Sequence, residues 1–529
     1  MLALVVFLNG MAIMVLEMAG ARLLAPWLGT SIIVWTSLIG VILASLSVGY
    51  WLGGQLADNR LNEKNKAQAE KGTSSGDVRQ KAYGVLSSIL FFASMSVFIT
   101  AMVQSVVLEF LSTAIASLHV AAVCAALLLF TIPSLLCGMV SPYAIRLAIT
   151  SSETSGAVIG RLNAISTVGS IVGTFLGGFV LISFFGSVET TIGVSAVLLF
   201  TAALVRGRPF IAKAALAACI LLAVFGVKSY SAYLAARDIH TIESPYSSMR
   251  VVNGTMDGRA MRLLLTDPES AQSGEFIDDP DELAFEYTKF YALGTSMNPD
   301  SRNVLMLGGG GYSVPKWLLS GRSELISKDF QLDVVELDPA MTKTAGAYFN
   351  APLEDPRMRV FHEDARSFIN RQASEIPSGQ SGKYNLIFAD IFNSWYTVPF
   401  HVGTREAAAN IYKLMSDDGI YIMNIITAVN GDNGRLLRSI RNAFAEVFGE
   451  VHVFPVQARY GGEMVQNVML LAFRTPRTLP DPATDPIPPH IRRMLANRWT
   501  TPFPAPEQDV PALSDNFAPV ERYTLGFKH

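Results

Sequence analysis

Hydrophobic and polar positions divide the chain into two unlike parts. Up to about residue 230 the sequence consists largely of long apolar runs. A helix needs about 20 apolar residues to cross a hydrocarbon core about 30 Å thick. Runs of roughly this length cover residues 2–21, 31–55, 83–106, 117–140, 162–184, 188–205 and 209–227. The pattern predicts a multi-span α-helical membrane domain, a transmembrane helical bundle of about seven spans, in residues 1–230.

Small and charged residues mark two places within this bundle. In the fifth run, Gly169, Gly173 and Gly177 recur every four residues and share one helix face. Such spacing predicts close packing of a neighbouring backbone, with a glycine-lined substrate path as the alternative. Glu17 and Arg22 stand near the end of the first run, where a structural pairing and a functional role both stay open.

The second part of the chain alternates short apolar runs with amphipathic ones. Buried strands are predicted over residues 303–308, 331–338, 384–392 and 418–426. Residues 357–369 read as a strand that runs into a helix, and residues 405–415 as a helix. This alternation predicts a doubly wound, mostly parallel α/β sheet over residues 240–475. The proline-rich C-terminal extension, residues 476–529, is predicted to be an extended surface connector, in which Asp515 or Glu521 either docks or reaches the site.

Composition narrows the classes of partner and of site. The formal net charge of -3 gives no reason to expect nucleic acid. Cys124, Cys137 and Cys219 all lie in apolar runs, and the second part has no cysteine, which excludes a cysteine-based metal site there. We expect no metal.

Basic residues between the apolar runs bear on the topology. They cluster after the second, fourth and sixth runs, which the positive-inside rule assigns to the cytoplasm. If all seven runs cross, the α/β domain emerges on the outer side. The reaction expected of the α/β domain favours the cytoplasm instead. We expect a multi-pass protein of the cell membrane with a cytoplasmic α/β domain, and the sequence leaves this conflict open.

A run of four glycines, GGGGYS, follows the strand at 303–308 and precedes a helix. A P-loop would need Lys-Ser/Thr after the run, and none follows. A dinucleotide fingerprint would need glycine at its sixth position, where Ser313 stands. Glycines alone do not separate a dinucleotide site from an adenosylmethionine site.

Three acidic residues stand at the ends of consecutive strands. They distinguish between these kinds of site better than the glycines do. Glu336, Asp364 and Asp390 stand at the ends of the second, third and fourth predicted strands. Ligands of parallel α/β sheets bind outside the carboxyl ends of the strands. A carboxylate after the second strand can accept from both ribose hydroxyls, and one after the third can accept from an adenine amino group. The pattern predicts a nucleoside site.

These motifs resemble the spermidine synthase family of aminopropyltransferases, whose fold is that of class I adenosylmethionine-dependent methyltransferases, here with a small N-terminal β-hairpin region. The resemblance covers residues 240 to about 475, and with the bundle the chain resembles the fused facilitator/spermidine synthase proteins. GGGGYS stands where the family reads GGGDGG, and ADIFNS stands where it reads DSSD. VVELDP and EDA match the motifs whose acidic residues bind the nucleoside in the family. The resemblance implies that the donor is bound by Gln272, Gly308, Gly309, Gly310, Glu336 and Asp364.

The resemblance also assigns the reacting end of the site. It makes Asp390 the catalytic general base and places Glu286, Asn393 and Tyr396 at the substrate. Departures from the family lie here, since Gly311 replaces the acid that holds the donor's amine and Asn393 replaces the second acid of DSSD. Two carboxylates that would bind a polycation are therefore missing, and Glu286 replaces only one of them.

The expected activity is that of a membrane-anchored transferase. Aminopropyl transfer from decarboxylated S-adenosylmethionine to a small-molecule amine is the leading reaction. Methyl transfer from S-adenosylmethionine is the first alternative, and a transporter with a nucleoside-sensing domain is the second. The donor is a co-substrate, and no permanently bound cofactor is expected. The lipid bilayer is the other expected partner, and a homodimer stays open.

Overall fold

The computed structural model describes most of the chain as two compact units. One comprises residues 1–237 and 243–245, and the other residues 238–242 and 246–529. The described residues exclude 30, 72–74, 116, 150–154, 206–209, 267–270, 326–327, 378, 392–398 and 525–529. The side chains of residues 61–71, 75–79, 183, 230, 231 and 234 are likewise outside the description.

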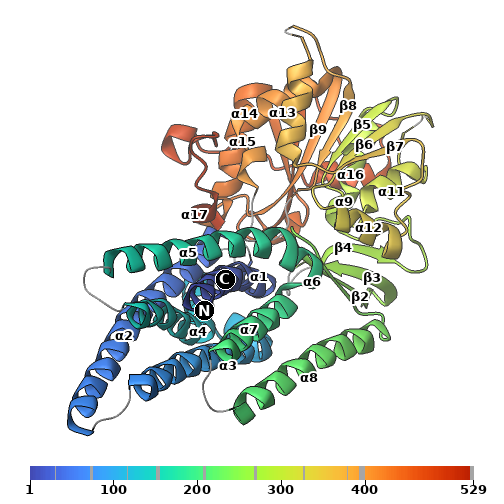
Figure 1. Cartoon of the computed structure of the whole chain (residues 1–529). Helices are drawn as coiled ribbons and strands as arrows, with labels where there is room; N and C mark the ends of the chain where they lie inside the picture. Colours follow the sequence, from blue (N-terminus) through green and yellow to red (C-terminus); the bar gives the residue numbers. More distant parts are fainter. Residues whose placement is uncertain are drawn as a thin grey trace. The chain divides into compact units, whose positions relative to one another are not determined.

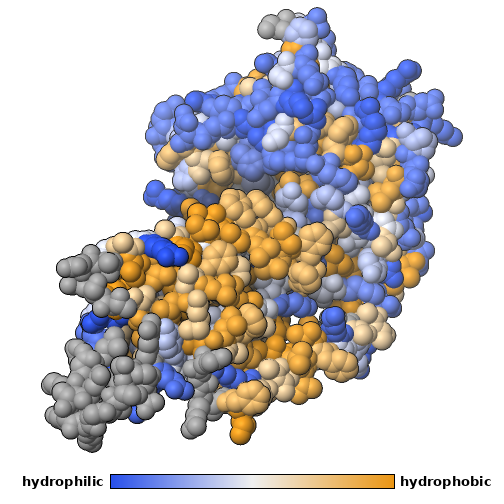
Figure 2. All heavy atoms as spheres, in the orientation of Figure 1, coloured by the Kyte–Doolittle hydropathy of each residue, from blue (hydrophilic) through white to orange (hydrophobic). Residues whose placement is uncertain are grey.

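The first unit is a bundle of helices, coloured blue to green in Figure 1. Its elements are α1 (Leu2–Leu28), α2 (Ile32–Lys71), α3 (Ser75–Ala114), α4 (Leu118–Ala148), α5 (Ser155–Leu176), η1 (Gly177–Leu181), α6 (Ile182–Phe185), α7 (Ser187–Leu204) and α8 (Phe210–Ala235). α2 packs along α4, α1 along α5 and α3 along α7. Apolar side chains dominate the visible surface of these helices (Figure 2), as lipid contact requires.

Seven helices of the described residues are long and apolar enough to cross a membrane, which confirms the predicted number. They extend beyond several predicted ends, because polar residues at a helix end continue the backbone hydrogen bonding after the apolar run stops. The largest difference concerns the connection at residues 56–82, which was expected to be a loop. There α2 continues to Lys71 and α3 begins at Ser75.

The glycine repeat on α5 lies against α1, as the spacing predicts. A Cβ atom at Gly169 would lie 2.1 Å from the carbonyl oxygen of Phe7, and one at Gly173 would lie 2.4 Å from that of Met11. A Cβ atom at Gly177 would be in ordinary contact, 3.4 Å from Val15 Cα. Two of the three glycines are thus needed for the close approach of the two backbones.

We expect Gly173→Ala to lower the stability of the bundle, by about 1–3 kcal/mol if it behaves like other overpacked sites. The midpoint of thermal unfolding in detergent measures this. Gly160→Ala, on the same helix with nothing within 4 Å of the new Cβ atom, is the control. It should be neutral or stabilising, because alanine is the better helix former. Equal unfolding midpoints for the two variants would refute the packing role.

The second unit begins with a four-stranded antiparallel sheet and continues as an α/β domain. The small sheet contains β1 (His240–Glu243), β2 (Ser248–Met256), β3 (Arg259–Leu265) and β4 (Ala271–Phe276) in that order. The α/β domain contains α9 (Glu286–Lys289), α10 (Ala292–Met297), β5 (Asn303–Leu307), α11 (Ser313–Leu319), β6 (Gln331–Val335), α12 (Pro339–Tyr348), β7 (Met358–Phe361), α13 (Ala365–Glu375), β8 (Tyr384–Ala389), η2 (Phe400–Val402), α14 (Arg405–Leu414), β9 (Met415–Thr427), η3 (Asp432–Gly434), α15 (Arg435–Phe448), β10 (Val451–Pro455), η4 (Ala458–Tyr460) and β11 (Gln466–Phe473).

The seven-stranded sheet has the order β10-β11-β9-β8-β5-β6-β7. The five strands from β5 to β9 are mutually parallel, with Leu307 level with Val335 on one side and with Ala389 on the other. β11 runs antiparallel between β9 and β10. This is the class I methyltransferase topology, which confirms the predicted fold.

Both faces of this sheet are buried, because alternate residues of each strand enter different cores. Leu305 and Leu307 of β5 pack with α13, α14 and α15, and Val304 and Met306 pack on the opposite face with α10 and α11. A sheet covered by helices on both faces leaves its strand ends as the accessible places for a polar site.

The C-terminal extension is more ordered than the expected connector. It forms α16 (Pro489–Ala496), η5 (Pro506–Gln508) and α17 (Val520–Thr524). Ile491, Leu495 and Leu513 are each at most 3% exposed and belong to the domain core. The proline content concealed these elements, since the apolar residues that anchor them are widely spaced along the chain.

Candidate active site

The glycine run lies where β5 ends, next to the end of β8. Gly308 has a φ of +90°, and a Cβ atom there would lie 2.1 Å from the carbonyl oxygen of Asp390. Its N–H donates to Val335 O at 2.8 Å, and the Asp390 N–H donates to Leu307 O at 2.8 Å. Only glycine fits this position, both for its backbone angle and for its neighbour. The contact sets Asp390 beside the glycine loop.

Glu336 closes the glycine loop from the end of β6. Its Oε2 accepts hydrogen bonds from the N–H groups of Gly309 at 2.9 Å and Gly310 at 3.1 Å. Its Oε1 accepts from the N–H of Asp338 at 2.9 Å. Burial raises the pKa of the Glu336 carboxyl, and these three N–H donors oppose that shift. The predicted nucleoside acid therefore lies directly against the loop.

Gln272 and Ser273 bring the small sheet to the same loop. Ser273 Oγ accepts from the Gly311 N–H at 2.9 Å. A Cβ atom at Gly311 would lie 2.6 Å from Ser273 Cβ, so the space of the family's acid is occupied here. Gln272 Oε1 is buried and has no hydrogen-bond partner among the described residues. A buried acceptor of this kind requires a donor from a ligand or water.

A buried ion pair connects β4 to the helix that follows the glycine loop. Lys316 of α11 donates to the Glu275 carboxylate of β4, and both side chains are at most 5% exposed. Lys316 Nζ also donates to Phe349 O, and Asn350 Nδ2 donates to Glu275 Oε1, each at 2.8 Å. Both charges have hydrogen-bond partners, and the pair holds β4 against α11.

Asp390 has two hydrogen-bond donors from different elements. Asn424 Nδ2 of β9 donates to Oδ1 at 2.9 Å, and the Tyr287 hydroxyl of α9 donates to Oδ2 at 3.0 Å. Burial raises the pKa of the Asp390 carboxyl, and the two donors partly oppose this by favouring the anion. Burial and the nearby Asp390 charge raise the pKa of Tyr287, which keeps its proton. Such a carboxylate is a stronger proton acceptor than a solvated aspartate.

A cavity of about 200 Å³ lies between Asp390 and the glycine loop. Its lining includes residues predicted from the sequence and residues that the prediction missed, namely Gln272, Ser273, Gly309, Gly310, Phe285, Tyr287, Asp390, Asn424, Gln466 and Asn467. Asn467 Nδ2 donates to Asn424 Oδ1 at 3.0 Å, which orients the amide that contacts Asp390. Gln466 and Asn467 escaped the sequence analysis because β11, the strand that carries both of them, was not predicted.

The predicted substrate residues have different locations. Glu286 is exposed and pairs with Lys289 at 2.6 Å, so its carboxylate lies outside the cavity lining. Its neighbours Phe285 and Tyr287 line the cavity instead. Asn393 and Tyr396 fall outside the described residues.

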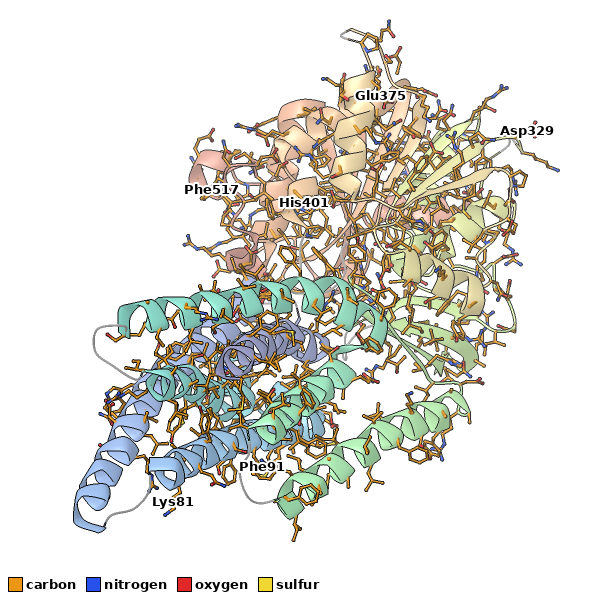
Figure 3. All side chains as sticks on the ribbon, viewed as in Figure 1. Lys81, Phe91, Asp329, Glu375, His401 and Phe517 are labelled. Carbon is orange, nitrogen blue, oxygen red and sulfur yellow. The ribbon has the colours of Figure 1, made fainter. Side chains whose placement is uncertain are left out.

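Asp364 caps the first turn of α13 at the end of β7. Its Oδ1 accepts from the Ser367 N–H at 2.9 Å, and its Oδ2 lies 3.2 Å from His401 Nε2. The hydrogen bond with His401 and that from the Ser367 N–H lower the pKa of the Asp364 carboxyl to about 2. His401 lies on η2, just before α14 (Figure 3). Asp364 is thus an anion at the strand end, although it does not line the cavity beside Asp390.

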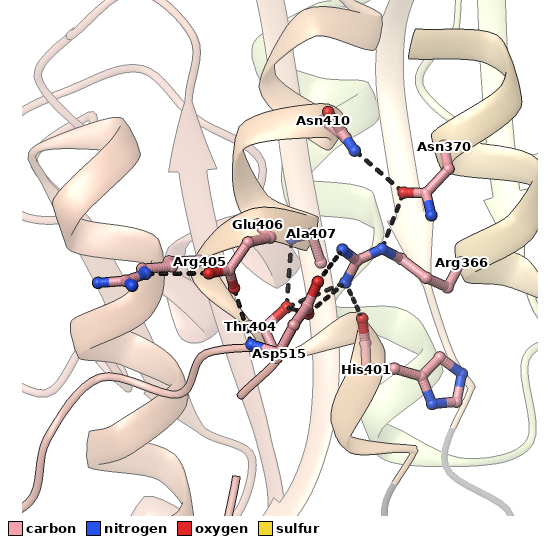
Figure 4. Close-up of polar contacts among 9 residues, drawn as sticks. All are labelled: Arg366, Asn370, His401, Thr404, Arg405, Glu406, Ala407, Asn410 and Asp515. Atoms are coloured by element: carbon pink, nitrogen blue, oxygen red, sulfur yellow. Dashed lines mark hydrogen bonds and ion pairs between the residues drawn. The ribbon is translucent and has the colours of Figure 1, made fainter. Parts of the chain in front are cut away.

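Asp515 docks the C-terminal extension on the helices beside this acid (Figure 4). Arg366 of α13 contacts both Asp515 carboxylate oxygens, at 3.0 and 2.7 Å. The Thr404 hydroxyl donates to Asp515 Oδ1 at 2.7 Å, and the Asp515 N–H donates to Glu406 at 3.0 Å. Of the two roles left open by the sequence, these contacts favour docking.

We expect Asp515→Asn to weaken the docking of the extension by about 1 kcal/mol, a modest value because Asp515 is half exposed. The rate of limited proteolysis within residues 476–529 measures the loss. Glu507→Gln, which removes an exposed charge from the same extension, is the control and should leave the rate unchanged. Equal cleavage rates for both variants would contradict the docking role.

Together, the fold and the geometry of the site define the class of protein to which the second unit belongs. It is an α/β domain of the class I methyltransferase type, with a glycine loop, a strand-end acid on that loop, and a second, buried acid in a polar cavity.

Comparison with known proteins identifies which proteins the chain resembles. No family model matches the chain. The polyamine aminopropyltransferase of Vibrio vulnificus is 29% identical over 252 residues, which is 47% of this chain and 76% of that protein. That of Clostridium beijerinckii is 24% identical over 225 residues, or 41% and 70% of the two chains. A probable spermidine synthase structure from Corynebacterium glutamicum has a TM-score of 0.38 at 21% identity, covering 45% of this chain and 81% of that one. The relatives confirm the predicted resemblance to the spermidine synthase family.

Proposed function

We propose that the chain is a membrane-anchored aminopropyltransferase that moves an aminopropyl group from decarboxylated S-adenosylmethionine to a small-molecule amine. One observation carries the proposal, the Asp390 carboxylate held by Tyr287 and Asn424 in a cavity beside the glycine loop. The similarity to polyamine aminopropyltransferases supports the same reaction.

The reaction is a direct displacement at the propyl carbon bonded to the donor's sulfonium sulfur. The lone pair of the amine nitrogen forms the new C–N bond, and the C–S bond breaks with its electron pair returning to sulfur. The neutral thioether that leaves is methylthioadenosine. The attacking nitrogen needs its lone pair, so a proton must leave the amine, and Asp390 accepts it.

The residues of this chain supply position and proton transfer. Tyr287 and Asn424 hold both oxygens of Asp390, so the base keeps one orientation while the amine approaches it. Burial keeps the pKa of Asp390 above its usual range, which makes it a stronger base than a solvated aspartate.

We assign the binding site of the donor to the carboxyl ends of the strands. Gly308, Gly309 and Gly310 with Glu336 would hold its ribose, and Asp364 its adenine. Gln272 lines the cavity near the donor's tail, where its unpartnered Oε1 can accept a hydrogen bond from the aminopropyl ammonium. An oxygen acceptor suits a donor that ends in an ammonium group.

Methyl transfer from ordinary S-adenosylmethionine is the second candidate. It is favoured by the absence of an acid at Gly311, where Ser273 occupies the space. A donor with a carboxylate on its tail would meet no opposing acid at that position. The products separate the two reactions, since methyl transfer releases S-adenosylhomocysteine.

For the location, we propose a multi-pass protein of the cell membrane with its α/β domain in the cytoplasm. The seven long apolar helices support the location in a membrane. The supply of a nucleoside donor supports the cytoplasmic side for the α/β domain. A reporter active on one side of the membrane, fused after His529, tests the orientation. A homodimer is compatible with this proposal.

Donor and base are tested together with the full chain in detergent. We expect decarboxylated S-adenosylmethionine plus an amine mixture to give amine-dependent methylthioadenosine, detected by mass spectrometry. Asp390→Asn should reduce the turnover by about 10²–10⁴-fold with donor binding retained, because only the proton acceptor is lost. Asp432→Asn, at an aspartate whose side chain is 87% exposed, is the control. S-adenosylhomocysteine from the ordinary donor would select methyl transfer, and full activity of Asp390→Asn would refute the base.

The pH dependence provides a separate test of Tyr287. The active form of Asp390 is the anion, so activity rises with pH through its pKa. The Tyr287 hydrogen bond favours that anion, and Tyr287→Phe should therefore raise the pKa and move the acidic limb of kcat/KM to higher pH. Tyr460→Phe, at an exposed tyrosine, should leave the limb in place. A shift to lower pH would contradict the assignment.

A further inference from the structure

Three amide side chains cover the side of the cavity that lies beside Asp390. Asn424 comes from β9, and Gln466 and Asn467 begin the antiparallel strand β11. Asn467 donates to Asn424, which in turn donates to Asp390. Asn424 therefore uses one N–H group and its oxygen within this network, whereas Gln466 lies outside this chain of hydrogen bonds.

The orientation of Gln466 is determined by its neighbour. Its Oε1 accepts a hydrogen bond from the Gln457 N–H at 2.6 Å. A backbone N–H can only donate, so exchanging the oxygen and nitrogen of this amide would set two donors against each other. The nitrogen is therefore Nε2, and it is buried and has no hydrogen-bond partner among the described residues, in a residue that is only 6% exposed.

An unpartnered donor on a residue that lines a cavity needs an acceptor from a ligand or water. An ammonium group cannot satisfy it, because an ammonium has only donors. The cavity also lacks a second negative charge, since Asp390 is the one carboxylate in its lining among the described residues. A diamine would thus place its far ammonium near a donor and without a counter-ion, at a cost in desolvation.

We infer that the acceptor substrate is an amine whose far end carries a hydrogen-bond-accepting oxygen, such as a hydroxyl or a carbonyl, and that Gln466 Nε2 binds this oxygen. The inference rests on the proposed function for the role of the amine nitrogen, which faces Asp390. It makes Gln466 the residue that selects an oxygen-bearing amine over a diamine.

Binding of matched amines to the full chain in detergent tests the inference. The probes are 4-amino-1-butanol, 1,4-diaminobutane and pentylamine, which place a hydroxyl, an ammonium or a methyl group at the same distance from the amine. Isothermal titration calorimetry, with methylthioadenosine present at a saturating concentration, gives each Kd. We expect the amino alcohol to bind about tenfold more tightly than either other probe, which is the scale of one hydrogen bond.

The conservative variant Gln466→Glu should reverse this order. It keeps an oxygen for the Gln457 N–H and replaces the Nε2 donor with an acceptor that attracts an ammonium, so the diamine should become the tightest probe. Gln380→Glu, the same change at an exposed loop position, should leave the order unchanged. If the glutamate variant does not fold, Gln466→Met should bring the amino alcohol to the affinity of pentylamine.

Each result decides the question. Tightest binding of the diamine to the unmodified chain, an unchanged order in Gln466→Glu, or no binding of the amino alcohol would overturn the inference. Turnover is read separately from the same probes. Gln466-dependent binding of the amino alcohol without methylthioadenosine formation would support the inference while refuting aminopropyl transfer, so the two failures are distinguishable.

Discussion

The contact between Gly308 and Asp390 is the constraint on which the site depends. β5 and β8 are neighbouring parallel strands, and their carboxyl ends lie so close that a Cβ atom at Gly308 would lie 2.1 Å from the Asp390 carbonyl oxygen. The end of β5 starts the glycine loop and the end of β8 carries the buried acid, so this contact joins the two. The loop amides, their partner Glu336 and Asp390 therefore occupy fixed positions relative to one another.

Among the described residues that line it, the cavity around this contact carries a single negative charge. Asp390 is the one carboxylate of its described lining, and it is surrounded by amides and a tyrosine hydroxyl. The buried Glu275–Lys316 pair, whose charges compensate each other, carries β4 and its Gln272 to the same cavity. A site of this kind stabilises one cationic nitrogen well and a second one poorly.

Each unit solves its packing problem in a different way. In the bundle, the glycines on α5 let two backbones approach, because apolar helices in lipid gain little from burying larger apolar side chains. In the α/β domain, helices cover both faces of the sheet, and the C-terminal extension adds Asp515 to the polar contacts of Arg366 and Thr404. The extension thereby stabilises the region that presents Asp364.

The sequence alone determined the seven apolar helices, the five strands β5 to β9 and the positions of Glu336, Asp364 and Asp390 at strand ends, because periodicity and local motifs encode these features. Only the tertiary structure decided that Gln466 joins the cavity and that Glu286 lies outside it. The cavity is formed by residues far apart in sequence. Gln466 belongs to a late antiparallel strand inserted beside β9, and no local pattern reports which distant strand will become a neighbour.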